Sequence, residues 1–342
     1  PQTAQERWEE ESGYSPSSIA AEIAGLFCAA DIAVQEDHLA DGLIWAALAD
    51  SWTAYVEPWT VTEKGTKCHQ HTPYYVRVTR HGDPDAGQLR TLANNGPTLD
   101  EREIIDAGFL ELVRLGIKSP DDTIVRNSIK EVDNTIRVDL PEGPAFYRYN
   151  GDGYGERAVE DEGAPWSIDA KGKGRLWPIF TGERGEYELR RGAEDGSLEP
   201  RNLLETMSEF ANSGRMIAEQ VWDRQHSTDY NWELGEGTGA ATPLAWSMAQ
   251  YVRLAHGIDA GEPVEMPQVV ADRYQESSRP EGPTLEANTR YLANKLVVSG
   301  RSDAAMIAVK TPSETKVIEP TGDSFEVALD IEFGEDQVIV DA

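Results

Sequence analysis

The spacing of apolar residues changes along this chain, and the change limits the folds open to it. Up to about residue 275, apolar side chains recur every three or four positions, as on one face of an α-helix. After about residue 284 the period becomes two, in short runs such as 325–329 separated by turn residues. Helices and strands therefore occupy successive regions, without the alternation that builds a parallel sheet.

The first region predicts about seven helices joined by long loops. Ser15 and Pro16 provide an N-cap and a first helical residue, and Asp100 with Glu103 resembles a capping box. The predicted helices cover about residues 16–35, 40–57, 100–116, 120–131, 183–191, 200–214 and 242–257. This pattern predicts a mainly α fold, a toroid or barrel of helical hairpins that is incomplete in this chain.

The second region predicts a small β-domain. A segment rich in Ser, Pro and Gly at residues 276–283 is typical of a linker, and the short strands at 284–342 predict a small sandwich of immunoglobulin type. We therefore expect one domain over residues 1–275 and a β-domain over 284–342. We also expect that something N-terminal to residue 1 is missing, and that Ala342 is another truncation.

The charge balance excludes some partners. The 342 residues include 61 acidic and 31 basic side chains, spread along the chain, for a net charge of −30. Such a surface repels nucleic acid and anionic membranes. No run of 18 apolar residues indicates a transmembrane span. A halophilic-type surface is one hypothesis and a mildly acidic extracellular enzyme is the alternative, so localisation stays open, with a secreted protein favoured and a cytoplasmic one allowed.

The cysteines do not indicate a metal site. Cys28 lies in an apolar helical run and is expected to be a buried thiol. Cys68, His69 and His71 form a short cluster, but no matching His or Cys pair lies elsewhere. We expect no metal there. A structural calcium ion near Asp152 or in the β-domain remains an alternative.

The first residues of the chain combine an aromatic ring with carboxylates. Trp8 precedes Glu9 and Glu10, just before the first helix. A carboxyl group packed against tryptophan loses water and its neutral form is favoured, which suits a general acid. The alternative is a merely acidic loop that caps the first helix, because Asp and Glu are stabilising at helix N-termini.

A second carboxylate has similar neighbours. Glu219 lies beside Gln220 and Trp222, at the end of an apolar helix and before a Gly-rich loop. Two such carboxylates at one end of a helical barrel form a glycosidase pair, although spacing alone is weak evidence in so acidic a chain. The aromatic and Gly-rich stretch 146–155, which includes Tyr149, suits sugar binding, where rings stack on the sugar face.

Several ordered motifs resemble those of glucoamylases and glucodextranases, the inverting family 15 glycoside hydrolases. Residues 6–35 resemble the general-acid segment, residues 174–178 with 181–185 resemble a substrate-contacting segment, and residues 218–223 with 241–247 resemble the general-base segment and last helix. The resemblance covers about residues 1–275. More weakly, residues 284–342 resemble the β-domain that follows the catalytic domain of bacterial glucodextranases. The family fold is an (α/α)6 barrel preceded by an N-terminal β-sandwich, and we expect this chain to contain its later helices.

The resemblance implies roles for particular residues. It implies that Glu9 is the general acid and Glu219 the general base. Trp8 and Glu10 would contact the sugar near the cleaved bond. The remaining implied substrate-binding residues are Arg175 for sugar hydroxyls, Trp177 and Tyr149 as pocket walls, and Gln220 and Trp222 beside the base.

The activity implied is inverting, exo-acting hydrolysis of α-glucans that releases β-glucose from non-reducing ends, without a required cofactor. The α-1,4 linkage of glucoamylases, the α-1,6 linkage of glucodextranases and trehalose are alternative substrates. From a different class, the chain could be an inactive carbohydrate-binding fragment. Its partner would then be the missing N-terminal part of the same enzyme, present as a second chain.

Overall fold

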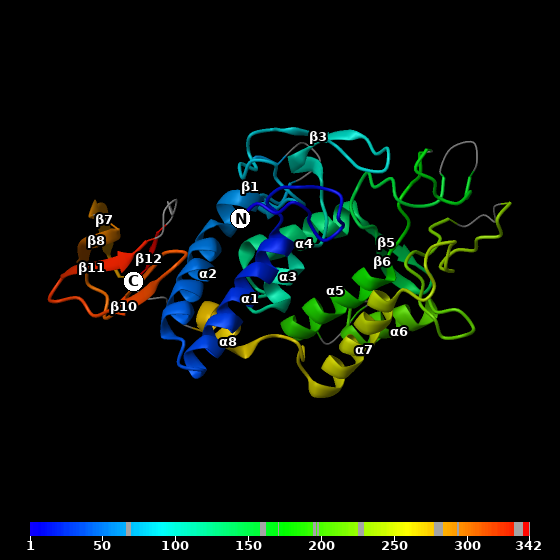
Figure 1. Cartoon of the computed structure of the whole chain (residues 1–342). Helices are drawn as coiled ribbons and strands as arrows, with labels where there is room; N and C mark the ends of the chain where they lie inside the picture. Colours follow the sequence, from blue (N-terminus) through cyan, green and yellow to red (C-terminus); the bar gives the residue numbers. More distant parts are fainter. Residues whose placement is uncertain are drawn as a thin grey trace. The chain divides into compact units, whose positions relative to one another are not determined.

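The computed structural model describes residues 1–65, 70–157, 162–169, 171–193, 196, 198–224, 229–276, 283–292, 294–331 and 338–341 (Figure 1). The chain divides into two compact units. The first unit combines Pro1–Ala21 with Tyr55–Met266, and the second combines Glu22–Ala54 with Pro267–Ala342. Residues 22–54 thus belong with the β-strands, whereas the sequence placed them in the first region. The predicted boundaries at 275 and 284 stay a prediction, and residues 277–282 of the linker lie outside the described residues.

Helices dominate the chain up to residue 276. They are α1 (Pro16–Gln35), α2 (Leu39–Thr60), η1 (Glu101–Glu103), α3 (Leu110–Arg114), α4 (Thr123–Thr135), α5 (Pro178–Arg191), α6 (Pro200–Glu209), α7 (Ala245–Ala260), α8 (Gln268–Ala271) and the π-helical turn η2 (Asp272–Glu276). Short antiparallel pairs join β1 (Val61–Thr62) to β2 (Tyr74–Tyr75), β3 (Leu89–Thr91) to β4 (Thr98–Asp100), and β5 (Arg137–Leu140) to β6 (Gly143–Phe146).

Of the predicted helix at 100–116, only Leu110–Arg114 is α-helical, as α3, whereas the other predicted helices are present with shifted ends. Asp100 caps only the short turn η1, and the chain becomes extended at Ile104. There the carbonyl of Ile104 accepts a hydrogen bond from the Arg77 N–H (3.2 Å), and Asp106 forms a bridge with Tyr149. Tertiary pairing of this apolar run therefore overrides its helical spacing.

Helix α5 lies at the centre of the first unit, where it packs against α6 and α7 (Figure 1). Its glycines allow the close approach. A Cβ atom on Gly182 would lie 2.4 Å from the Gln250 side chain of α7, and one on Gly185 would lie 2.5 Å from Leu254. Glycine at both positions of the 181–185 motif is thus explained by helix packing. The buried face of α5 begins directly after Trp177 and so fixes the position of that residue.

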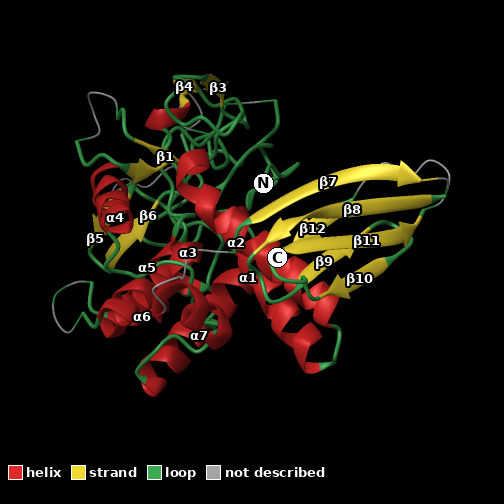
Figure 2. Ribbon diagram, turned by 90° about the vertical axis from the view of Figure 1, so that its left-hand side faces the viewer, coloured by secondary structure: helices red, strands yellow, loops and turns green. Residues whose placement is uncertain are grey.

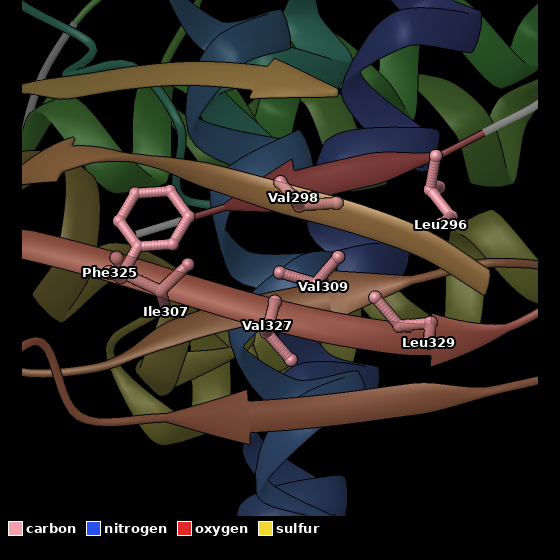
Figure 3. Packing of buried hydrophobic residues seen from close by; sticks show 7 residues of the cluster. All are labelled: Leu296, Val298, Ile307, Val309, Phe325, Val327 and Leu329. Atoms are coloured by element: carbon pink, nitrogen blue, oxygen red, sulfur yellow. The ribbon is translucent and has the colours of Figure 1, made fainter. Parts of the chain in front are cut away.

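The second unit contains a small β-sandwich (Figure 2). One sheet has the order β11-β8-β7, from β7 (Leu285–Leu292), β8 (Lys295–Ser302) and β11 (Ser324–Asp330). The other has the order β10-β9-β12, from β9 (Ile307–Lys310), β10 (Thr315–Ile318) and β12 (Ile339–Asp341). Side chains from β8, β9 and β11 form the core between them (Figure 3). The predicted mainly α chain followed by a small β-sandwich is confirmed.

Helix α1 has the length and apolar character that could cross a membrane, over its 20 residues. The buried core helix of a soluble protein meets the same criteria, so this is weak evidence. The expectation that the chain has no membrane partner stays a prediction.

Candidate active site

The first fifteen residues form a closed loop in the first unit. Thr3 pairs with Gly13, and Tyr14 pairs with Thr79 in the segment that follows β2. Gly13 has a φ of +149°, and a Cβ atom there would lie 2.4 Å from the Thr79 carbonyl oxygen. Glycine is therefore required for the loop to approach this segment so closely. The loop presents Glu9 and Glu10 between its two anchored ends.

Three of the four glutamates in this loop form buried ion pairs. The Arg77 guanidinium lies 2.9 Å from carboxylate oxygens of both Glu6 and Glu10. Arg90 binds Glu11 and also lies 2.9 Å from Glu101. Both arginines are fully buried. The acidic loop is therefore held by two cations that lie far along the chain.

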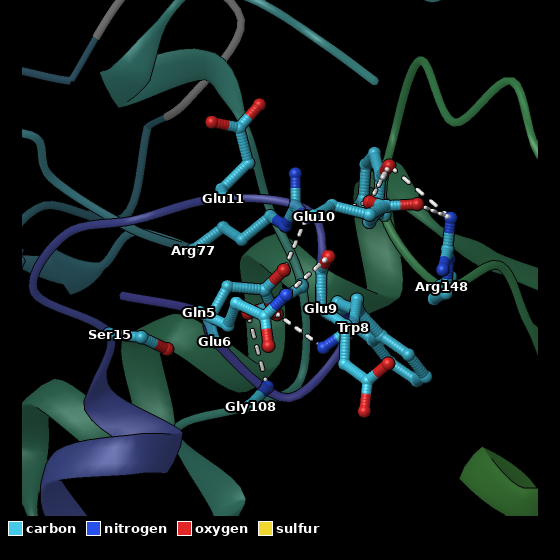
Figure 4. Close-up of polar contacts among 12 residues, drawn as sticks. Gln5, Glu6, Trp8, Glu9, Glu10, Glu11, Ser15, Arg77, Gly108 and Arg148 are labelled. Carbon is cyan, nitrogen blue, oxygen red and sulfur yellow. Dashed lines mark hydrogen bonds and ion pairs between the residues drawn. The ribbon is translucent and has the colours of Figure 1, made fainter. Parts of the chain in front are cut away.

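Glu9 is the exception. Its carboxylate accepts no hydrogen bond from the part of the chain that the structure describes, and the side chain is exposed. Its backbone has a φ of +58°, which is unusual for a residue other than glycine. The Glu9 N–H donates to the Glu6 carbonyl oxygen (2.9 Å), and the Glu6 carboxylate accepts from the Trp8 N–H (3.0 Å). In Figure 4 the Glu10 side chain extends toward Arg148, while the Glu9 carboxylate carries no dashed line.

Two buried acids, Glu6 in this loop and Asp106 outside it, interact with the Arg77 charge. Burial raises the pKa of Glu6, and the Arg77 charge opposes the rise. Burial likewise raises the pKa of Asp106, against the charges of Arg77 and Arg7. Asp106 also accepts a hydrogen bond from the Gly108 N–H (3.1 Å). The loop that carries Glu9 thus rests on carboxyl groups whose ionised forms depend on Arg77.

Glu219 lies in an extended segment, so the expectation that it ends a helix is wrong. Helix α6 stops at Glu209, and Val221 forms bridges with Leu176 on one side and Gly237 on the other. Glu219 is half-buried, and its N–H donates to the Ala241 carbonyl oxygen (2.9 Å). Paired segments on both sides therefore hold the backbone of Glu219.

A tyrosine hydroxyl orients the Glu219 side chain. Burial, together with a hydrogen bond to the Glu219 carboxylate, raises the pKa of Tyr154. The Gln220 amide lies 3.4 Å from the same carboxylate, at the limit of a hydrogen bond. A hydroxyl that stays protonated can donate its hydrogen to the carboxylate and so hold it in one orientation.

Aromatic rings connect the segments of the two glutamates. The ring centroids of Trp8 and Trp177 are 5.3 Å apart, and those of Trp177 and Tyr154 are 6.4 Å apart. Glu9 follows Trp8 directly in the sequence, and the Glu219 carboxylate is hydrogen-bonded to the Tyr154 side chain. The structure thus brings together four of the sequence-predicted site residues, from regions some two hundred residues apart in the sequence.

Glu10 and Tyr149 lie in one network of hydrogen bonds, and their predicted contact with the sugar stays a prediction. Glu10 accepts hydrogen bonds from Asn94 (2.7 Å), Arg148 (2.5 Å), Arg77 (2.9 Å) and the Tyr149 hydroxyl (2.6 Å). Tyr149 is only 1% exposed, and the Arg77 guanidinium lies 3.8 Å from its ring centroid. Because these groups satisfy one another, Glu10 anchors the loop and Tyr149 lies beneath it.

Arg175, Gln220 and Trp222 are also buried, and their predicted part in substrate binding stays a prediction. The Arg175 guanidinium binds Asp223 (2.7 Å) and lies 4.1 Å from the ring centroid of Trp222. Burial opposes ionisation of Asp223, but the Arg175 charge leaves its pKa below the usual value. Gln220 accepts a hydrogen bond from the Arg175 N–H (2.8 Å). These three residues support the segment that carries Glu219.

The described residues contain no group of His, Cys, Asp or Glu that could hold a metal ion. Cys68 and His69 lie outside the described residues, so their cluster with His71 is not tested. At Asp152, both carboxylate oxygens bind Arg148, at 2.7 and 2.8 Å. Arg148 therefore occupies this carboxylate, and the structural calcium ion stays a prediction.

Sequence reasoning missed Tyr154 and Arg77. Tyr154 lies in the aromatic stretch 146–155, but nothing in the pattern distinguishes it from its neighbours. Arg77 did carry a signal, because it is a lone charge inside the apolar segment 74–78. A charge in such a run indicates a buried ion pair with acids elsewhere in the chain.

Comparison with known proteins identifies the class as glycoside hydrolases. The family model described as Glycosyl hydrolases family 15 matches residues 1–256. The chain therefore belongs to glycosyl hydrolases family 15, as the sequence motifs predicted.

Two relatives extend this result. A glucoamylase from Clostridium sp. (strain G0005) is 43% identical over 274 residues, covering 80% of this chain and 36% of that protein. A crystal structure of a bacterial glucoamylase complexed with acarbose matches with a TM-score of 0.72 at 42% identity, covering 80% of this chain and 38% of that chain. The match confirms the predicted (α/α)6 fold class. The chain spans little more than a third of the length of these relatives.

Proposed function

We propose that this chain carries the acid and base of an inverting, exo-acting α-glucoside hydrolase of the glucoamylase type. One observation carries the proposal. Glu9 is the glutamate of its loop that no described cation binds, and aromatic rings connect its segment to the one that carries Glu219. A carboxyl group kept out of ion pairs can exchange a proton with substrate or water.

In the proposed mechanism, Glu9 donates its proton to the glycosidic oxygen that leaves. Glu219, oriented by Tyr154, accepts a proton from the water that attacks the opposite face of the sugar. Inversion requires room for that water, so the two carboxyl groups of the complete site should lie about 6.5–9.5 Å apart. Trp8 and Trp177 would contact the sugar near the cleaved bond. This chemistry requires no cofactor.

The substrate we propose is an α-1,4-linked glucan or oligosaccharide, with β-glucose released from its non-reducing end. Both relatives are called glucoamylases, and one of them was crystallised with acarbose, an oligosaccharide. The α-1,6 linkage and trehalose are the alternatives. Hydrolysis of maltose, isomaltose, dextran and trehalose, measured side by side, distinguishes the three. NMR of fresh product should show the β-anomer, and the α-anomer would exclude inversion.

A pair of variants tests the proposed acid. Glu9→Gln should lower turnover about 10²–10⁴-fold, because a positioned proton donor contributes that much to the rate. The matched control is Glu11→Gln, in the same loop but bound to Arg90, and it should retain most of the turnover. Near-normal turnover of Glu9→Gln would remove Glu9 from the mechanism.

A second candidate is a sugar-binding piece that acts only with a further polypeptide, the N-terminal part of the same enzyme. The observation in its favour is that the chain covers only 36–38% of its relatives. Acarbose binding, followed by tryptophan fluorescence, without hydrolysis of any of the four substrates would support this candidate. Intact mass of the purified sample would show whether a second chain accompanies it.

A further inference from the structure

Strand β7 leaves one edge of its sheet open. In the order β11-β8-β7, β8 is its one neighbour among the described strands. All eight residues of β7 pair with β8 in continuous register, and seven of the eight are exposed. The strand contains no proline. A long, regular edge of this kind presents unpaired N–H and C=O groups to which another strand can bond.

The sequence of this edge is complementary to itself. If a second copy of β7 lies antiparallel with Asn288 opposite Asn288, Glu286 of each copy faces Arg290 of the other. The same register places Leu285 of each copy opposite Tyr291 of the other. If the two strands shift by one residue in either direction, Glu286 of one copy no longer lies opposite Arg290 of the other. Opposite charges and aromatic–aliphatic pairs across strands are stabilising, and like charges are not.

The charges of β7 are available for such pairing. Arg290 lies 3.0 Å from Glu326, but the two side chains are 62% and 61% exposed. Exposed ion pairs of this kind contribute little, so Arg290 can exchange partners at small cost. Glu286 lies opposite Arg301, whose guanidinium already binds Asp323.

The apolar side chains also favour a neighbour. Tyr291 and Leu292 are 64% and 63% exposed at the end of the strand. Tyr291 lies opposite Leu296, a buried member of the sandwich core, so its side chain is on the inner face of the sheet, at the edge that no described strand covers. A second β7 would continue the sheet and cover part of this face.

We propose that β7 is an interface between two copies of this chain, paired antiparallel about Asn288. The interface is isologous, so each copy contributes the same Glu286 and Arg290 to two identical ion pairs. A single strand pair is a small interface, which makes the dimer weak and dependent on concentration.

The test measures the mass of the full chain by sedimentation velocity over a range of concentrations, at the lowest salt in which circular dichroism shows it folded. Glu286→Arg and Arg290→Glu each place like charges opposite one another twice. Each variant alone should dimerise about tenfold or more weakly than the parent. An equimolar mixture of the two variants should associate again, because each then faces opposite charges. The double variant E286R/R290E should dimerise like the parent.

Lys295→Glu is the matched control. It makes the same change of charge on the neighbouring strand β8, at an exposed residue away from the open edge, and should leave dimerisation unchanged. A parent chain that stays monomeric at all concentrations would overturn the proposal. Association that neither single variant weakens, or a mixture of the two that fails to associate, would overturn it as well.

Discussion

Replacement of Arg77 by methionine tests whether this buried cation holds the loop of Glu9 in place. Arg77 is fully buried and lies 2.9 Å from both Glu6 and Glu10. Methionine keeps much of the volume of the side chain but removes the charge. Glu10 retains three other hydrogen-bond donors, so the main loss falls on Glu6 and Asp106, for which Arg77 is the strongest stabilising charge.

The expected loss in the free energy of unfolding is about 3 kcal/mol at pH 7. Removing one partner of a buried ion pair costs about 3–5 kcal/mol, because the remaining charge stays buried without a partner. The stacking of Arg77 on Tyr149, 3.8 Å from the ring centroid, is lost as well. Against this, the Nε and Nη1 groups of Arg77 have no hydrogen-bond partner among the residues that the structure describes, so removing them recovers part of their burial cost. The net value therefore lies at the lower end of the range.

The loss should also depend on pH. The folded-state pKa values of Glu6 and Asp106 lie above their unfolded values, so their contribution to stability is lost as pH rises through the folded values. Without Arg77 both pKa values rise further, and the variant should therefore lose more stability at pH 7 than at pH 5. Urea unfolding followed by tryptophan fluorescence measures both values.

The control for this experiment is Arg301→Met, which removes an exposed arginine from its pair with Asp323 and should not measurably change stability. The reasoning would be refuted by a loss below about 1 kcal/mol for Arg77→Met at pH 7, which is the value of a surface pair. A loss of equal size at pH 5 and pH 7 would refute the argument that removing Arg77 raises the pKa values of Glu6 and Asp106 further.

Three further predictions concern the base, the buried acid and the surface charge. Tyr154→Phe should lower kcat about tenfold with little change in KM, since it removes the hydroxyl that orients Glu219; unchanged kcat would exclude that role. Asp106→Asn should flatten the fall in stability as pH rises from 4 to 8, since burial raises the pKa of Asp106, and an unchanged slope in urea unfolding would contradict this. The net charge of −30 predicts that stability rises from low to molar salt as repulsion is screened; a chain equally stable in both would contradict a halophilic-type surface.

Local pattern was sufficient for much of the fold, whereas the resemblance to family 15 decided the choice of candidate glutamates. The spacing of apolar residues, with a period of 3.6 and then of two, predicted most helices and the β-sandwich, because this spacing depends on which face of each element is buried. The same pattern failed at 100–116, where Ile104 and Asp106 bond to other segments instead of forming a helix. It also failed at Glu219, whose segment pairs with Leu176 and Gly237.

By itself, the sequence determined the family, the order of helices before strands, and the position of Glu9 beside Trp8. Residue type alone leaves the four glutamates of the opening loop chemically alike, and only the family resemblance singled out Glu9. The tertiary structure distinguishes them by their partners, because the cations that bind Glu6, Glu10 and Glu11 come from distant parts of the chain, as Arg77 does from 67 residues beyond Glu10. The sequence can indicate that a cation such as Arg77 is buried but not which carboxylate it binds, so only the fold shows that Glu9 has no ion pair among the described residues.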